Sequence, residues 1–200
     1  MTDSFDVVAA EFRHESDPIK GSRFVATVSP APTPAEAEAV VARVRAADPN
    51  ATHHCWAYRT GRPCDRFRFS DDGEPGGSAG RPILQQIEGH GLTDTVVVVT
   101  RWFGGTKLGV GGLIRAYGGC TARALDLAPK KTLLLTRRVA ASFPYECLSA
   151  VQRVLAAHQL EPLEAEYGEA VAMTLEVPVC ELEDFRRELR DRTAGRIQLD

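Results

Sequence analysis

The stretch Thr95–Tyr117, TVVVVTRWFGGTKLGVGGLIRAY, gives the strongest indication of the fold. Thr95–Phe103 carries a continuous apolar run, which predicts a strand that is buried on both faces. Gly104–Gly112 is a glycine-rich loop, and apolar residues then recur at helical spacing from Leu113 to Leu127. The sequence therefore predicts a mixed α and β domain built around this strand.

Further elements are predicted on the N-terminal side of this stretch. Strands are expected at Phe5–Arg13, Arg23–Ser29, His53–Arg59 and Arg66–Phe69, which are rich in β-branched and aromatic residues. A capping box with proline at the first helical position predicts that a helix begins after Thr33. Ser78 is predicted to cap a short helix that runs to about Glu88.

The second part of the chain has a different order of elements. The boundary is predicted near Ala128-Pro129-Lys130-Lys131, which divides the chain into residues 1–128 and 129–200. The expected elements are a strand at Thr132–Phe143, a helix at Tyr145–His158, a hairpin at Leu160–Val177, a helix at Glu181–Arg192 and a strand at Arg196–Leu199. This β-α-β-β-α-β order is that of a ferredoxin-like domain, so the predicted class is α+β.

Composition and charge exclude several classes of protein. A chain of 200 residues with 44% hydrophobic and 26% charged residues is typical of a globular protein. The net charge of −3 argues against attraction of the whole molecule to nucleic acid or to a membrane. The five cysteines are scattered without a CxxC motif, which favours reduced thiols. Because no signal peptide or membrane span is apparent, we expect a cytoplasmic protein with no membrane partner.

The glycine-rich loop is a candidate anion site. Its backbone N–H groups precede a helix, and Arg101, Lys107 and Arg115 can add charge-assisted bonds to phosphate. The spacing matches neither a Walker A loop nor a dinucleotide fingerprint, because Val110 follows Gly109 where Walker A needs lysine. Two interpretations stay open, namely contact with a polyanion and close packing of the glycines against the sheet.

The acidic segment Asp71-Asp72-Gly73-Glu74 is a second candidate. Three carboxylates within four positions can hold a hard cation or act as general acid and base. The alternative is turn chemistry, in which aspartate side chains bond nearby amides and Gly73 supplies a positive φ. Spacing alone favours the turn.

Histidines and cysteines form a third constellation at His53, His54, Cys55 and Cys64. Adjacent histidines in a strand point to opposite faces, so they are not expected to bind one metal together. One of them can still face the acidic segment and move a proton. No catalytic residue is identified, but His54, Asp72 and Glu74 are the candidates, and no metal site is predicted.

Basic residues form two groups. Arg59, Arg62, Arg66 and Arg68 flank one turn, with Trp56, Tyr58 and Phe67 nearby, a mixture that suits phosphate contact and base stacking in RNA. Asp65 reduces the positive charge of this group. The alternative to RNA contact is that the group forms a solvated loop. The second group is Lys130, Lys131, Arg137 and Arg138. Contact with RNA or the ribosome is favoured if the two groups share a face.

Two long segments resemble a known family. Phe69–Pro82, FSDDGEPGGSAGRP, and Val97–Tyr117 resemble the signature of the IMPACT/YigZ family, and Lys20–Phe24 and His53–Cys55 resemble two further family segments. The resemblance covers nearly the whole chain. Gly21 interrupts the family's usual pattern after Lys20, which weakens any role for that lysine.

The resemblance implies a particular pair of folds. The N-terminal domain is expected to be like the second domain of a small-subunit ribosomal protein and like domain IV of elongation factor G. The C-terminal domain is expected to be like domain V of that factor. Eukaryotic relatives act in translational control by binding the activator of a stress kinase, but the recruitment domain for that partner is absent here, so the partner is not expected.

Three functions are compared. The first is a translation-linked protein that binds RNA or the ribosome. The second is an enzyme that acts on a phosphorylated or nucleotide-like small molecule with Mg²⁺, and the third is a protein-interaction module. No cofactor is expected outside the second. The predicted binding residues are Ser22, Arg23, His54, Asp71, Asp72, Glu74, Arg101, Gly104, Gly105, Lys107, Gly109, Gly111, Gly112 and Arg115.

Overall fold

The computed structural model describes residues 4–61 and 66–200, which form two compact units, Phe5–Leu133 and Leu134–Asp200, the latter grouped with Ser4. The predicted mixed α and β fold with two domains is confirmed. The division follows Leu133 because β7 (Lys130–Leu134) pairs with β1 (Ser4–Val8) in a two-stranded sheet. Residues 62–65, which include the predicted Arg62, Cys64 and Asp65, lie outside the described residues.

The first unit contains a five-stranded antiparallel sheet in the order β2-β3-β6-β4-β5. Its strands are β2 (Phe12–Glu15), β3 (Arg23–Pro30), β4 (His53–Thr60), β5 (Arg66–Ser70) and β6 (Thr95–Trp102). The single strand predicted over Phe5–Arg13 is wrong. That segment divides because β1 pairs with β7, whereas β2 pairs with β3 in the larger sheet.

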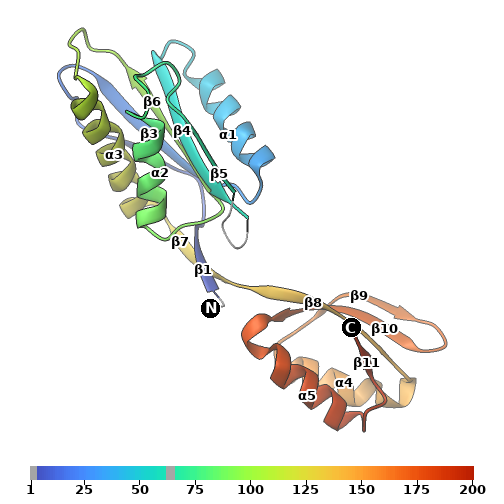
Figure 1. The fold of residues 1–200 in the computed structure, drawn as a ribbon. Helices are drawn as coiled ribbons and strands as arrows, with labels where there is room; N and C mark the ends of the chain where they lie inside the picture. The colour runs from blue at the N-terminus through green and yellow to red at the C-terminus, as the bar shows by residue number, and fades with distance from the viewer. Residues whose placement is uncertain (1–3, 62–65) are drawn as a thin grey trace. The chain divides into compact units, whose positions relative to one another are not determined.

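Helices cover both faces of this sheet (Figure 1). On one face lies α1 (Pro34–Ala47), and on the other lie α2 (Gly80–Gly89) and α3 (Val110–Leu127). Along the central strand β6, Val96 and Val98 belong to the core with α1, whereas Val97 and Val99 belong to the core with α2 and α3. The predicted burial of this strand on both faces is therefore confirmed.

The register of β6 with its neighbouring strands determines where the apolar core of the sheet ends and polar side chains begin. Arg101 follows Val99 on the face toward α2 and α3, because side chains alternate along a strand. Its partners across the sheet are Phe24 on β3 and His53 on β4. One end of the sheet therefore presents polar side chains beside the start of α3.

The second unit has the predicted β-α-β-β-α-β order. Its elements are β8 (Thr136–Phe143), α4 (Leu148–Ala157), β9 (Pro162–Tyr167), β10 (Val171–Pro178), α5 (Leu182–Arg192) and β11 (Gln198–Leu199), with short 3-10 turns at Tyr145–Cys147 and Val179–Glu181. The sheet is antiparallel in the order β11-β8-β10-β9. Phe143, Leu175 and Phe185 lie in its core. None of the helices in residues 4–61 and 66–200 combines the length and the apolar composition that a membrane span requires.

Candidate functional site

A pocket of about 380 Å³ opens at the polar end of the first sheet. The acidic segment, β4, β6 and the start of α3 contribute its lining, which consists of His53, Glu74, Pro75, Arg101, Phe103, Lys107, Leu108, Gly109, Val110 and Leu113. A hollow of about 500 Å³ also lies on the sheet of the second unit, beside Ala140, Glu164 and Thr174. The charged residues that line that hollow, Glu164, Glu166 and Asp200, are exposed, so the first pocket with its buried charges is the better candidate site.

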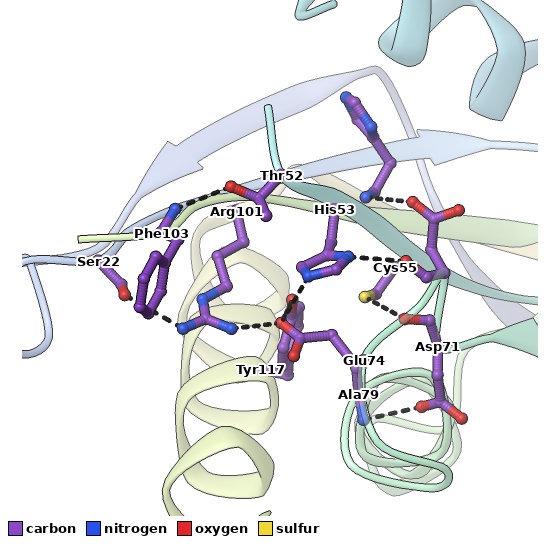
Figure 2. Close-up of polar contacts among 12 residues, drawn as sticks. Ser22, Thr52, His53, Cys55, Asp71, Glu74, Ala79, Arg101, Phe103 and Tyr117 are labelled. Atoms are coloured by element: carbon purple, nitrogen blue, oxygen red, sulfur yellow. Dashed lines mark hydrogen bonds and ion pairs between the residues drawn. The ribbon is translucent and has the colours of Figure 1, made fainter. Parts of the chain in front are cut away.

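Glu74 and Arg101 form a buried ion pair at the base of the pocket (Figure 2). Nη1 of Arg101 donates to Oε1 of Glu74 at 2.6 Å, and the side chains are 6% and 4% exposed for Arg101 and Glu74. The hydroxyl of Tyr117 donates to the same oxygen at 2.7 Å, and Nη2 of Arg101 donates to Oγ of Ser22 at 3.2 Å. Each charge is thus neutralised and hydrogen-bonded, as burial of an ion pair requires.

Aromatic rings further enclose Arg101. Its guanidinium carbon lies 5.5 Å from the ring centres of both Phe24 and Phe103, within the range of cation–π attraction. Because its charge is matched by Glu74, Arg101 offers little net attraction to a phosphate. The geometry therefore gives it a structural place in the pocket base and does not favour the predicted direct contact with phosphate.

Gly104 permits two backbone segments to cross. Its N–H group donates to Oγ of Ser22 at 3.2 Å, and a Cβ at this position would lie 1.9 Å from the carbonyl carbon of Gly21. Close packing is therefore the role of Gly104. By contrast, no atom lies within 4 Å of where a Cβ would stand at Gly105 or Gly109, so this part of the loop is open for contact.

His53, rather than His54, faces the pocket. The ring atom Nδ1 of His53 lies 2.8 Å from the backbone oxygen of Asp72, and Nε2 lies 4.0 Å from Oε1 of Glu74. Since a carbonyl oxygen only accepts, Nδ1 carries a proton. The proposal of His54 as the proton carrier is therefore corrected to His53.

The ring of His54 occupies the opposite face of β4. There its Nε2 is buried without a hydrogen-bond partner among the described residues, and burial lowers the pKa of His54. Alternation along the strand places His54 with Trp56 and Tyr58, which belong to the core beside α1. The predicted opposition of the two histidines is thus seen, but the sequence did not indicate which face held the pocket.

Asp71 caps helix α2. Its carboxylate accepts N–H bonds from Gly77 at 2.8 Å and from Ala79 and Gly80 at 2.9 Å. The prediction that Ser78 is the cap is wrong, because the hydroxyl of Ser78 is buried without a partner among the described residues. The more distant carboxylate reaches the helix N-terminus because the turn folds back on itself.

Asp72 also has a structural position. One of its carboxylate oxygens accepts the backbone N–H of His54 at 2.6 Å, and the other pairs with Arg45. Only Glu74 of the three acidic residues lines the pocket. The three carboxylates do not converge, and no group of three His, Cys, Asp or Glu that could hold a metal occurs within residues 4–61 and 66–200.

Two predicted cations remain available to a partner. Lys107 and Arg115 are exposed, and neither pairs with a carboxylate among the described residues. Arg23, in contrast, pairs with Glu15 and lies over the ring of Trp102. Among the predicted binding residues, the cations without a described carboxylate partner therefore lie in the glycine-rich loop and near the start of α3, where Gly111 and Gly112 also lie.

The arginine group on β4 and β5 lies away from this surface. Arg59 is paired in register with Phe67, six residues along β4 from His53, which corresponds to about 20 Å. Arg59 donates to the backbone oxygen of Leu92, and Arg68 pairs with Glu38. The described arginines of this group are therefore at the opposite end of the sheet from the pocket.

Tyr117 and Phe24 are fully buried, contact the Glu74–Arg101 pair and were not predicted as site residues. Their rings meet edge to face with centres 5.3 Å apart, and burial raises the pKa of Tyr117. Beside them, burial raises the pKa of the Cys55 thiol to about 12, so it is a poor nucleophile. The helical spacing placed Tyr117 on the core face of α3, and only the fold shows that its hydroxyl reaches Glu74.

Comparisons with known proteins agree with the motifs. The Impact N-terminal domain model matches residues 20–125, and a domain of unknown function, DUF1949, matches residues 142–196. A Thermus thermophilus protein named "IMPACT family member in pol 5′region" is 45% identical over 183 residues, covering 91% of this chain and 99% of that protein. IMPACT family member YigZ of Escherichia coli is 36% identical over 184 residues, 90% of each protein.

A solved structure supports the same conclusion for the fold. A crystal structure described as that of a hypothetical protein matches with a TM-score of 0.77 and 32% sequence identity. It covers 100% of this chain and 97% of its own chain. The matched domain, the relatives and the two central motifs agree, and the chain therefore belongs to the IMPACT family.

Proposed function

We propose that this protein binds RNA in the cytoplasm as part of translation, and that the ribosome supplies this RNA. The observation that carries the proposal is the exposure of Lys107 on the pocket rim and of Arg115 near the start of α3, neither of which pairs with a described carboxylate. Phe103, which is 46% exposed, lies on the same rim. Cations without carboxylate partners can neutralise phosphates, and an exposed ring can stack on a base.

The two folds support the proposal by analogy. The family resemblance implies that the first unit is like the second domain of a small-subunit ribosomal protein and domain IV of elongation factor G, and that the second is like domain V of that factor. Likeness of fold does not establish function, so the proposal rests on the exposed residues on the pocket rim and near the start of α3.

The dependence of RNA binding on salt tests the proposal. We expect the purified protein to bind ribosomes or ribosomal RNA at low salt. Lys107→Ala and Arg115→Ala should each lower the slope of log K against log salt by about 1 if each residue contacts one phosphate. Arg66→Ala removes an equal charge at the opposite end of the sheet and should leave the slope unchanged. Absence of binding at low salt, or an equal effect of Arg66→Ala, would contradict the proposal.

A second candidate is an enzyme acting on a phosphorylated or nucleotide-like small molecule. The orientation of His53 favours it, because the proton on Nδ1 leaves Nε2 as a possible base beside the pocket. The form that uses Mg²⁺ is not favoured, since Asp71, Asp72 and Glu74 do not converge. Turnover of such a compound that is lost in His53→Gln would support this candidate. Co-purification of a protein without RNA would instead support an interaction module.

A further inference from the structure

The residues that line the pocket of the first unit suit the binding of one flat ring with polar groups on its edge. Its walls are apolar, with Pro75, Phe103, Leu108, Val110 and Leu113, whereas His53, Glu74 and Arg101 provide the polar groups. Ligand pockets measure roughly 300–1,000 Å³ in general, so a volume of about 380 Å³ suits a single small ligand. A nucleobase has this combination of apolar faces and a hydrogen-bonding edge.

The polar groups of the pocket determine which hydrogen-bonding edge of a nucleobase it can accept. Both side-chain bonds accepted by Glu74 use Oε1, and the described residues offer Oε2 no hydrogen bond. Nδ1 of His53 is bonded to a backbone oxygen, and in the neutral imidazole a proton on Nδ1 leaves Nε2 with a lone pair. Two acceptors, Oε2 of Glu74 and Nε2 of His53, are therefore left for N–H donors of a ligand.

Guanine is the base that suits these two acceptors. It presents two adjacent N–H groups on one edge, the ring N1–H and the exocyclic amino group. Uracil lacks an amino group and matches less well. The guanidinium of Arg101 already bonds Glu74 and Ser22, and it holds Glu74 in place at the pocket base.

The rim supplies the remaining contacts of a nucleotide. The N–H of Phe103 donates to Oγ1 of Thr52 at 3.0 Å, which restrains the backbone that carries this exposed ring (Figure 2). A base that enters the pocket can stack on this ring. Lys107 is exposed on the same rim and can contact the phosphate.

We propose that this pocket binds one nucleobase with an exocyclic amino group, guanine in preference to the others, together with its phosphate. The inference rests on the proposed function, because the base belongs to an unpaired nucleotide of the bound RNA. A free nucleoside monophosphate presents the same chemistry and serves as the probe.

Titration of the full chain with the four nucleoside 5′-monophosphates tests the inference, with amide chemical shifts as the measurement. We expect GMP to bind at least about tenfold more tightly than UMP, equivalent to about 1.4 kcal/mol, and to shift amides of the pocket. Phe103→Ala should weaken GMP binding about tenfold or more, whereas Phe67→Ala, which removes an exposed ring at the far end of β4 and β5, should leave it unchanged. Lys107→Ala should weaken binding of GMP but not of guanosine. Equal binding of UMP and GMP, or equal effects of the two phenylalanine variants, would overturn the inference.

A second set of measurements separates this inference from the proposed function. Short single-stranded RNAs that contain one guanosine are compared with the same RNAs carrying an abasic site there. A loss of at least about tenfold in affinity at the abasic site, absent in Phe103→Ala, supports a base in the pocket. Salt-dependent RNA binding that ignores the abasic site overturns the inference and leaves the proposed function standing. GMP binding without any RNA binding supports the pocket as a free-nucleotide site and overturns the proposed function.

Discussion

Nη1 of Arg101 lies 2.6 Å from Oε1 of Glu74, and neither side chain is more than 6% exposed. The two residues are 27 positions apart, and Tyr117 on α3 also bonds the shared oxygen. The pair thus joins the acidic segment, the central strand and helix α3 at the pocket base. Two opposite charges that are almost completely buried depend on each other, because either one alone would be left without compensation.

Variants of Glu74 and Arg101 are expected to be strongly coupled. Glu74→Gln leaves the guanidinium buried without a counter-charge, and Arg101→Met leaves the carboxylate in the same state. Each should lower the free energy of unfolding by about 3–5 kcal/mol. The double variant should cost at least about 1 kcal/mol less than the sum, measured by denaturant unfolding. Single effects that add to within about 0.5 kcal/mol would show that the residues act independently.

Substitutions at Asp71 and Ser78 test which of the two residues caps α2. Asp71→Ala removes the acceptor of three N–H bonds at the helix start, and it should lower the free energy of unfolding by about 1–2 kcal/mol. Ser78→Ala is the matched control, because the buried hydroxyl has no partner among the described residues and its loss should be nearly neutral. Thermal unfolding of the two variants measures the difference. A larger effect of Ser78→Ala would restore the sequence-based assignment.

His158 should make the stability of the second unit depend on pH. Its ring nitrogens lie 2.9 Å from Oε2 of Glu181 and 3.3 Å from Oε2 of Glu188. The hydrogen bond to Glu181 is the main cause of a raised pKa, and the bond to Glu188 adds to it. A raised folded-state pKa gives stabilisation that is fully present below the unfolded value of 6.5 and is lost as pH rises through the folded value.

We therefore expect wild type to exceed His158→Gln in stability by a larger margin at pH 5.5 than at pH 8.5. The difference between the two margins should be about 0.5–1 kcal/mol, because Glu181 is 45% exposed and solvent screens the interaction. Chemical unfolding gives the margins, and NMR titration of the ring gives the pKa. Glu181→Gln should lower that pKa. Margins that are equal at the two pH values would contradict the assignment.

Local patterns account for what was predicted correctly. The capping box at Thr33 involves residues three positions apart, and the structure has its side chain accepting the N–H of Glu36 at 3.3 Å. The apolar run of β6 and the order of elements in the second unit likewise depend on periodicities of two and about 3.6 residues. These patterns involve residues that are close in the sequence, so they can be recognised without knowledge of the fold.

The sequence by itself determined the family, the main elements and the position of the acidic and glycine-rich segments. Only the tertiary structure decided that His53 rather than His54 faces the pocket, that Asp71 caps α2, and that Arg101 is matched by Glu74. Alternation along a strand separates two faces but does not say which one is covered by which helix. Ser22 and Arg101 are 79 residues apart, so their contact depends on strand pairing that no local pattern specifies.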